Sequence, residues 1–133
     1  MNSSHEIPLQ IASELIDVEF YRYRRYQVRL SVVVICFENG AVPEGIFEKL
    51  EDLVRKTDLI TQISHCTLFL GFPHTSLAES HRAMERFSPV LKQFSPTYYY
   101  GVSEAIPEDQ EALDLIRRAI RELEQQAPEC LHC

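Results

Sequence analysis

The sequence contains an almost wholly apolar, β-branched run, Ser31-Val32-Val33-Val34-Ile35-Cys36-Phe37. A run of this composition is typical of a strand buried on both faces, because a half-exposed strand would alternate apolar with polar side chains. Asn39 and Gly40 follow closely and favour a turn. The sequence therefore predicts a central strand at 31–37, whose two faces are covered by other elements.

The residues before this strand have the spacing of an amphipathic helix over 8–28. Its last turns, residues 21–26, mix tyrosine with arginine. Interleaved aromatic and basic side chains can stack on and pair with nucleic acid. Arginines also suit the negative end of a helix dipole, and we favour this second interpretation. The apolar stripe of the helix consists of Leu9, Ala12, Ile16 and Phe20.

Two short strands after the central one are separated only by Ser64-His65-Cys66, which predicts an antiparallel hairpin. Ser76 and Glu79 form the capping box of a later helix. The elements predicted downstream of the central strand are a helix from Pro43 to Val54, strands at 59–63 and 67–72, a helix from Ser76, a strand at 97–102 and a helix from Pro107 to before Pro128. The resulting order, α-β-α-β-β-α-β-α, predicts an α/β (α+β) fold with a ferredoxin-like, palm-type antiparallel sheet covered by helices.

The composition predicts one globular domain over residues 1–133, with 1–6 and 127–133 as flexible tails. A net charge of −7 argues against nucleic acid as a partner, because binding to phosphates requires a basic face. No apolar run is long enough to span a membrane and the first residues are polar, so we expect no membrane association and a cytoplasmic location. Four cysteines without a signal peptide favour reduced thiols over disulfides.

Six short segments follow one another in a distinctive order between Ile7 and Leu123. They are Arg25-Tyr26-Gln27-Val28-Arg29-Leu30-Ser31, Arg55-Lys56-Thr57-Asp58-Leu59-Ile60, Ile63-Ser64-His65-Cys66-Thr67-Leu68, Phe72-Pro73-His74-Thr75-Ser76-Leu77, Tyr100-Gly101-Val102-Ser103 and Leu115-Ile116-Arg117-Arg118-Ala119. In this order they resemble "RRYGRPLSLLLLD", "RxSDLV", "LGGDEF", "LPxTSL", "SIGVA" and "LLxxADxALY" of the GGDEF (diguanylate cyclase) domain family. The resemblance implies the family's palm-type fold and a role in bacterial cyclic di-GMP signalling.

The resemblance also shows where this chain departs from the family at the metal site. Enzymes of the family hold two magnesium ions with carboxylates from the first strand and from the hairpin signature. Cys36 stands at the first metal-binding aspartate, and Cys66 and Thr67 stand at the two acidic letters of the signature. Glu38 matches the second acidic position at the strand end. Because magnesium requires hard oxygen ligands, this set predicts that no metal is held.

The nucleotide-binding positions of the family are changed as well. Ser64 and His65 replace the hairpin glycines that let the family's backbone approach the phosphates, and their side chains obstruct that approach. The segment between the central strand and Arg55 is short and lacks the family's guanine-reading "FKxIND" and "GHxxGD" motifs. Taken together, these departures predict a degenerate GGDEF-like domain that is not an enzyme and has no cofactor.

Arg55 and Asp58 match the family's product-inhibition motif, RxxD, which precedes the hairpin signature by five residues. An arginine can donate two hydrogen bonds to O6 and N7 of guanine and also binds phosphate well. A carboxylate can accept from the N1–H and N2–H groups of guanine. These residues therefore predict a ligand site for cyclic di-GMP. The alternative is that Asp58 serves only a turn or a surface ion pair.

The cysteines support a second hypothesis. In the expected fold, Cys36 and Cys66 lie near each other, and with the adjacent His65 they could form a soft-metal site or a redox pair. The simpler interpretation is that Cys36 is a small buried apolar residue and Cys66 a changed loop position. The segment Cys130-Leu131-His132-Cys133 has zinc-like spacing, but it is expected to be part of a mobile terminal tail.

From these observations the sequence predicts a catalytically inactive regulatory domain that docks a protein partner or its own copy. The alternative function is a cyclic di-GMP receptor that binds through Arg55 and Asp58. An enzyme of another chemistry is disfavoured, because no nucleophile–base pair and no complete metal set is visible in the sequence.

Overall fold

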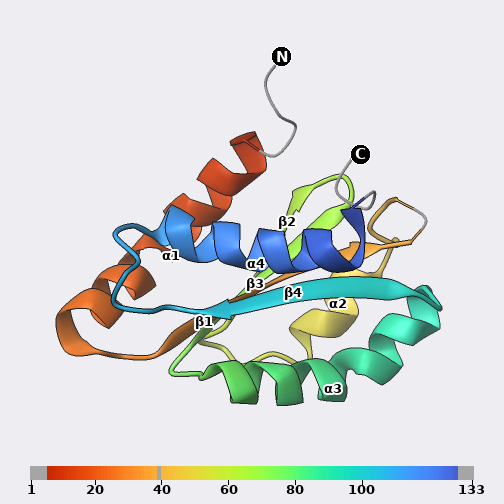
Figure 1. The fold of residues 1–133 in the computed structure, drawn as a ribbon. Helices are drawn as coiled ribbons and strands as arrows, with labels where there is room; N and C mark the ends of the chain where they lie inside the picture. The colour runs from red at the N-terminus through yellow and green to blue at the C-terminus, as the bar shows by residue number, and fades with distance from the viewer. Residues whose placement is uncertain (1–5, 39, 129–133) are drawn as a thin grey trace.

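The computed structural model describes residues 6–38 and 40–128, which form four helices and a four-stranded sheet (Figure 1). The elements are α1 (Glu6–Tyr26), β1 (Leu30–Phe37), α2 (Ile46–Glu51), β2 (Leu59–Ser64), β3 (Thr67–Pro73), α3 (Leu77–Phe94), β4 (Tyr98–Glu104) and α4 (Ala112–Gln126). Their order is the predicted one. The pairing of β2 with β3 confirms the antiparallel hairpin.

The strand order of the sheet is β2-β3-β1-β4, and every neighbouring pair is antiparallel. Every residue of β1 is buried, because β1 has a strand on each side and helices over both faces. Cys36 lies opposite Thr67 on β3 and opposite Tyr99 on β4. This topology confirms the predicted ferredoxin-like, palm-type antiparallel sheet.

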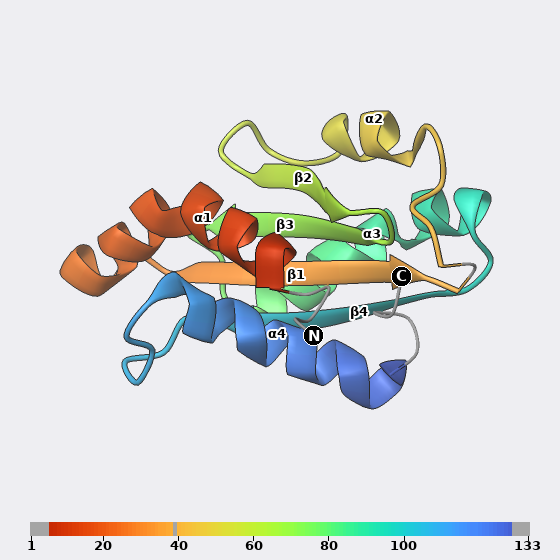
Figure 2. The same ribbon diagram turned by 90° about the horizontal axis from the view of Figure 1, so that it is seen from above.

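The helices divide the core into two layers, with α1 and α4 on one face of the sheet and α2 and α3 on the other (Figures 1 and 2). Val32, Val34 and Cys36 pack with α1 and α4. Val33 and Ile35 pack with α2 and α3. Because successive side chains of a strand point to opposite faces, a strand between two helical layers must be apolar throughout. This explains the uninterrupted run in the sequence.

Two helices begin later than the sequence predicts. The chain after Pro43 turns through Gly45, whose φ of 88° is left-handed, so α2 begins only at Ile46. The last helix begins at Ala112 rather than Pro107, because the buried carboxylate of Asp109 accepts from the backbone N–H of Ile106 at 3.1 Å and holds a turn there. Both predictions placed the helix start at a proline that belongs to the preceding turn.

The basic C-terminal end of α1 is hydrogen-bonded to the loop between β4 and α4. The Nη1 of Arg24 donates to the carbonyl oxygens of Asp109 and Gln110 at 3.2 and 2.7 Å. The helix ends at Tyr26, and Gln27 follows with a left-handed φ of 57°. Among the described helices, none combines the length and hydrophobicity that a membrane span requires.

Side chains of α4 cover the outer edge of β4. Gln126 donates to the Tyr100 carbonyl at 2.9 Å, and the N–H of Val102 donates to Glu122 at 2.8 Å. The Nη2 of Arg118 donates to the carbonyl oxygen of Glu104 at 2.6 Å. The three α4 side chains are four residues apart and meet alternate residues of β4. They therefore protect the strand edge from pairing with another chain.

Candidate ligand-binding site

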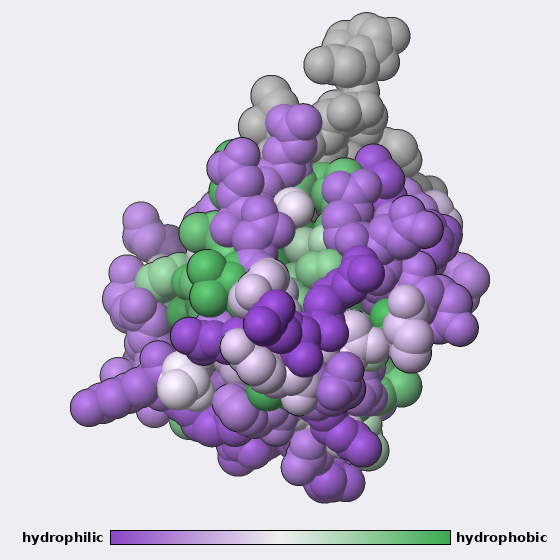
Figure 3. Space-filling model, turned by 90° about the vertical axis from the view of Figure 1, so that its left-hand side faces the viewer, coloured by the Kyte–Doolittle hydropathy of each residue, from purple (hydrophilic) through white to green (hydrophobic). Residues whose placement is uncertain are grey.

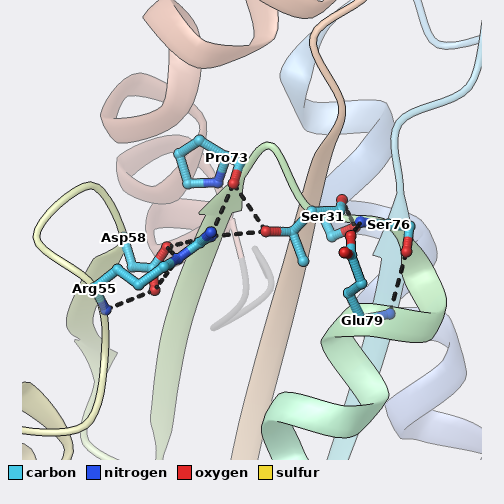
Figure 4. A network of polar contacts seen from close by, with 7 residues as sticks. Ser31, Arg55, Asp58, Pro73, Ser76 and Glu79 are labelled. Atoms are coloured by element: carbon cyan, nitrogen blue, oxygen red, sulfur yellow. Dashed lines mark hydrogen bonds and ion pairs between the residues drawn. The ribbon is translucent and has the colours of Figure 1, made fainter.

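The structure brings Arg55 and Asp58 together in the turn that precedes β2 (Figure 4). The backbone N–H of Arg55 donates to Oδ2 of Asp58 at 2.9 Å, and Nη2 of Arg55 donates to Oδ1 at 2.8 Å. The Asp58 side chain is 5% exposed, whereas that of Arg55 is 51% exposed. Asp58 therefore orients Arg55 and offers a ligand little surface of its own.

Arg55 also reaches the segment between β3 and α3. Its Nη2 donates to the carbonyl oxygen of Pro73 at 2.8 Å and lies 2.7 Å from Oγ1 of Thr75. The Thr75 hydroxyl in turn donates to the Pro73 carbonyl at 2.8 Å, and Ser31 on β1 donates to the Thr75 carbonyl at 2.8 Å. These bonds fix one edge of the guanidinium between the two segments, while half of the side chain stays exposed.

A cavity of about 270 Å³ opens beside this network, and α3 forms its far wall. Its lining includes Arg55 and Asp58 together with Arg82 and Arg86, which are four residues apart on α3. The sequence analysis did not identify Arg82 or Arg86. Their i, i+4 spacing is visible in the sequence, but only the packing of α3 against β3 shows that they face Arg55.

The charges of this cavity are unbalanced. Its two carboxylates are already engaged, since Asp58 binds Arg55 and Glu79 accepts from the N-cap N–H of α3 at 2.8 Å. This backbone hydrogen bond lowers the pKa of Glu79 below its usual value and keeps it ionised. Within residues 6–38 and 40–128, neither Arg82 nor Arg86 forms a hydrogen bond or an ion pair. The arrangement leaves exposed positive charge that suits an anion.

The positions that correspond to the family's catalytic signature lie at the opposite end of the hairpin. Cys36 ends β1, and the β2–β3 turn places Cys66 beside it, next to Thr67. The Sγ of Cys66 is 3.5 Å from Oγ1 of Thr67 and 3.6 Å from Oγ of Ser64. Cys36, Cys66 and Thr67 are buried, Ser64 is half-buried, and Glu38 and His65 are exposed.

The state of the two buried cysteines differs from the expectation. Cys36 and Cys66 are both disulfide-bonded, so the prediction of reduced thiols is wrong for them. The segment Cys130-Leu131-His132-Cys133 lies outside the described residues. Within the described residues, no group of three or more His, Cys, Asp or Glu side chains could hold a metal ion.

The sequence matches no family model and no curated protein. The fold, in contrast, is similar to solved structures of GGDEF domains. The GGDEF domain of DgcB from Caulobacter crescentus, in complex with c-di-GMP, has a TM-score of 0.70 at 10% identity, over 86% of this chain and 81% of that one. The active GGEEF domain of a diguanylate cyclase from Vibrio cholerae has a TM-score of 0.70 at 14% identity, over 87% of each chain. The diguanylate cyclase SiaD from Pseudomonas aeruginosa, with its activator SiaC, has a TM-score of 0.73 at 15% identity, over 90% of this chain and 54% of that one.

The chain therefore has the fold of GGDEF domains, which confirms the resemblance given by its sequence motifs. The prediction that the chain is not an enzyme is corrected by the same comparison. Its fold is that of enzymes, since the solved structures include a diguanylate cyclase domain described as active.

Proposed function

We propose that this chain is a receptor domain for cyclic di-GMP, which binds in the cavity beside Arg55. One observation carries the proposal: Arg55, Arg82 and Arg86 line the same cavity, while both carboxylates of that cavity are engaged by other groups. A cyclic dinucleotide is negatively charged on each phosphodiester, so it complements this excess of positive charge. The structure of DgcB in complex with c-di-GMP supports the choice of ligand.

The arginines of the cavity can bind different parts of the ligand. Guanine presents two acceptors, O6 and N7, on one edge, and a guanidinium matches them with a pair of parallel hydrogen bonds. In Arg55, Nε and Nη2 are engaged by Asp58, Pro73 and Thr75, so this side chain offers Nη1 to one of these acceptors or to a phosphate oxygen. Arg82 and Arg86 have no internal ion-pair partner among the described residues, so they are free to bind phosphate or the second base.

The size of the cavity limits what it encloses. A volume of about 270 Å³ lies just below the usual range of small-molecule pockets, about 300–1,000 Å³. The cavity therefore accommodates one guanine and its phosphate, and the other half of the ligand lies across the open mouth. The ligand is a second messenger of the bacterial cytoplasm, so the proposal includes a cytoplasmic location.

The test is calorimetric titration of the protein with cyclic di-GMP, beside cyclic di-AMP as a ligand of equal charge. We expect binding of cyclic di-GMP only, because adenine replaces the O6 acceptor of guanine with a donor. Arg86→Ala should weaken binding about tenfold, the loss expected for one arginine contact to a base or phosphate. Arg22→Ala is the matched control, because Arg22 is 53% exposed on α1 and, among the described residues, forms an ion pair with Glu19 alone.

Two results would contradict the proposal. Equal affinity for both dinucleotides would reduce the site to a general anion site without base recognition. Unchanged affinity in Arg86→Ala, with the protein folded, would place the ligand elsewhere.

A second candidate function is docking of a protein through α1. Ile11, Leu15, Val18 and Tyr21 form an exposed stripe on this helix, with Val18 61% exposed. Figure 3 shows the end of the molecule that carries the last turns of α1, where apolar side chains gather within a mainly hydrophilic surface. Such patches mark interaction sites. The complex of SiaD with its activator is a precedent in the same fold.

The simplest occupant of this stripe is a second copy of the chain. Multi-angle light scattering should then show a dimer that Val18→Glu converts to a monomer, because a carboxylate in an apolar interface is unpaired. A wild-type protein that stays monomeric at high concentration would eliminate self-association as the role of α1.

A further inference from the structure

The outer face of α1 carries a seam of side chains with the spacing of a helix-pairing surface. The seam consists of Ile11, Glu14, Val18, Tyr21 and Arg25, which follow one another in steps of three, four, three and four residues. This alternation keeps side chains on one narrow face and is the spacing with which helices pack in coiled coils. All five residues are exposed, Val18 by 61% and Tyr21 by 57%. The seam is therefore accessible to a second helix.

The seam is separate from the sides of α1 that hold the fold together. Ala12, Ile16 and Phe20 face the core and are buried. Arg24 points to the loop before α4, where it donates to two carbonyl oxygens. Figure 2 looks onto this side of the molecule, where α1 and α4 lie in front of the sheet. A partner can therefore contact the seam without disturbing the core.

The order of the side chains makes the seam complementary to itself. Glu14 lies four residues before Val18, and Arg25 lies four residues after Tyr21. In two antiparallel copies of α1 that meet midway along the seam, Val18 of each copy comes level with Tyr21 of the other. Glu14 of each copy then comes level with Arg25 of the other. Parallel copies would instead bring Glu14 to Glu14 and Arg25 to Arg25, where like charges repel.

Self-complementarity of this kind is what a two-fold symmetric dimer requires, because each residue meets the same partner residue in both directions. We propose that the chain forms an antiparallel dimer in which the seam of α1 packs against the seam of a second copy. Two ion pairs between Glu14 and Arg25 set the direction of the helices. The proposal rests on the second candidate function, docking through α1, and adds the geometry of the dimer and the residues that determine it.

The size of the surface sets the expected strength of the dimer. Glu14 and Arg25 are 11 positions apart, so the seam between them is about 17 Å long at 1.5 Å per residue. Leu15, which is 45% exposed, extends the apolar surface from the helix into a hollow of about 170 Å³ between α1 and β2. A single helix pair of this length is a small interface, typical of weak complexes. We therefore expect a dimer whose population depends on protein concentration.

The test is the dissociation constant of the dimer, measured on the full chain by sedimentation equilibrium at low ionic strength, where charge pairs are least screened. Glu14→Arg and Arg25→Glu each replace both ion pairs with like charges, so each should weaken the dimer at least about tenfold. The double variant Glu14→Arg/Arg25→Glu exchanges the two charges and should restore the wild-type constant. Glu85→Arg is the matched control, because Glu85 is exposed on α3, which covers the other face of the sheet. Circular dichroism of each variant checks that it is folded.

Two results would overturn this geometry and leave α1 as a docking surface. One is a dimer that Val18→Glu dissociates but the single charge reversals do not weaken. The other is a double variant that remains as weak as the single reversals. A wild-type chain that is monomeric at every concentration would overturn the geometry together with self-association. None of these results bears on the cyclic di-GMP site, because no seam residue lines the arginine cavity.

Discussion

At Gly101 on β4 the backbone of α4 lies directly against the sheet, and replacing this glycine with alanine should displace the helix. A Cβ at this position would overlap the carbonyl oxygen of Ala119 and lie 2.7 Å from the main-chain nitrogen of Leu123, against 3.4 Å for ordinary contact. Both atoms belong to the backbone of α4, so no side-chain rotation can relieve the overlap. The whole helix must move outward.

The expected cost has two contributions. Overpacking of a well-packed core costs about 1–3 kcal/mol. Outward movement of α4 also stretches the hydrogen bonds by which Arg118, Glu122 and Gln126 cover the edge of β4, each about 0.5–1.5 kcal/mol. With partial loss of these bonds, we expect the free energy of unfolding to fall by about 3–5 kcal/mol. This loss is a large part of the whole free energy of unfolding of a domain of this size, which is about 5–15 kcal/mol.

Urea unfolding followed by circular dichroism measures this loss, with Gly71→Ala on β3 as the matched control. A Cβ at Gly71 would lie 3.3 Å from the side-chain Cγ2 of Ile16, which can shift, and 3.5 and 3.8 Å from side-chain atoms of Leu59, which are ordinary contact distances. The control should therefore change stability by less than about 1 kcal/mol. If Gly101→Ala were no more destabilised than Gly71→Ala, the close packing of α4 on β4 would be refuted.

Three further predictions concern the ligand cavity and the strand edge. The hydrogen bond from the N-cap N–H of α3 lowers the pKa of Glu79 from 4.5. The ionised Glu79 therefore stabilises the fold above the unfolded pKa, and this stabilisation is lost as the pH falls through the folded pKa. An NMR titration of the Glu79 carboxyl group should show the lowered pKa. Thr75→Val removes an acceptor of Arg55 and should weaken cyclic di-GMP binding several-fold in calorimetry, while adding no volume to the core. Glu122→Lys leaves the N–H of Val102 without its acceptor and should promote chain association through β4, measured by light scattering.

The elements that the sequence predicted well are those specified by local chemistry. The β-branched run at 31–37 identified a strand buried on both faces, since only such a strand carries apolar side chains at every position. The capping box of Ser76 and Glu79 identified the start of α3, and both of its hydrogen bonds are present. In each case the determining residues lie within a stretch of at most seven residues.

The features that the sequence did not predict depend on contacts between distant segments. The start of α4 was placed at Pro107, but Asp109 pairs with Arg118 and organises a turn in its place. The shared cavity of Arg55 and Arg86 also depends on a contact between distant segments. The two residues are 31 positions apart in the sequence, and the packing of α3 on β3 brings them together. Local spacing can suggest an arginine pair on a helix, but not the surface that this pair faces.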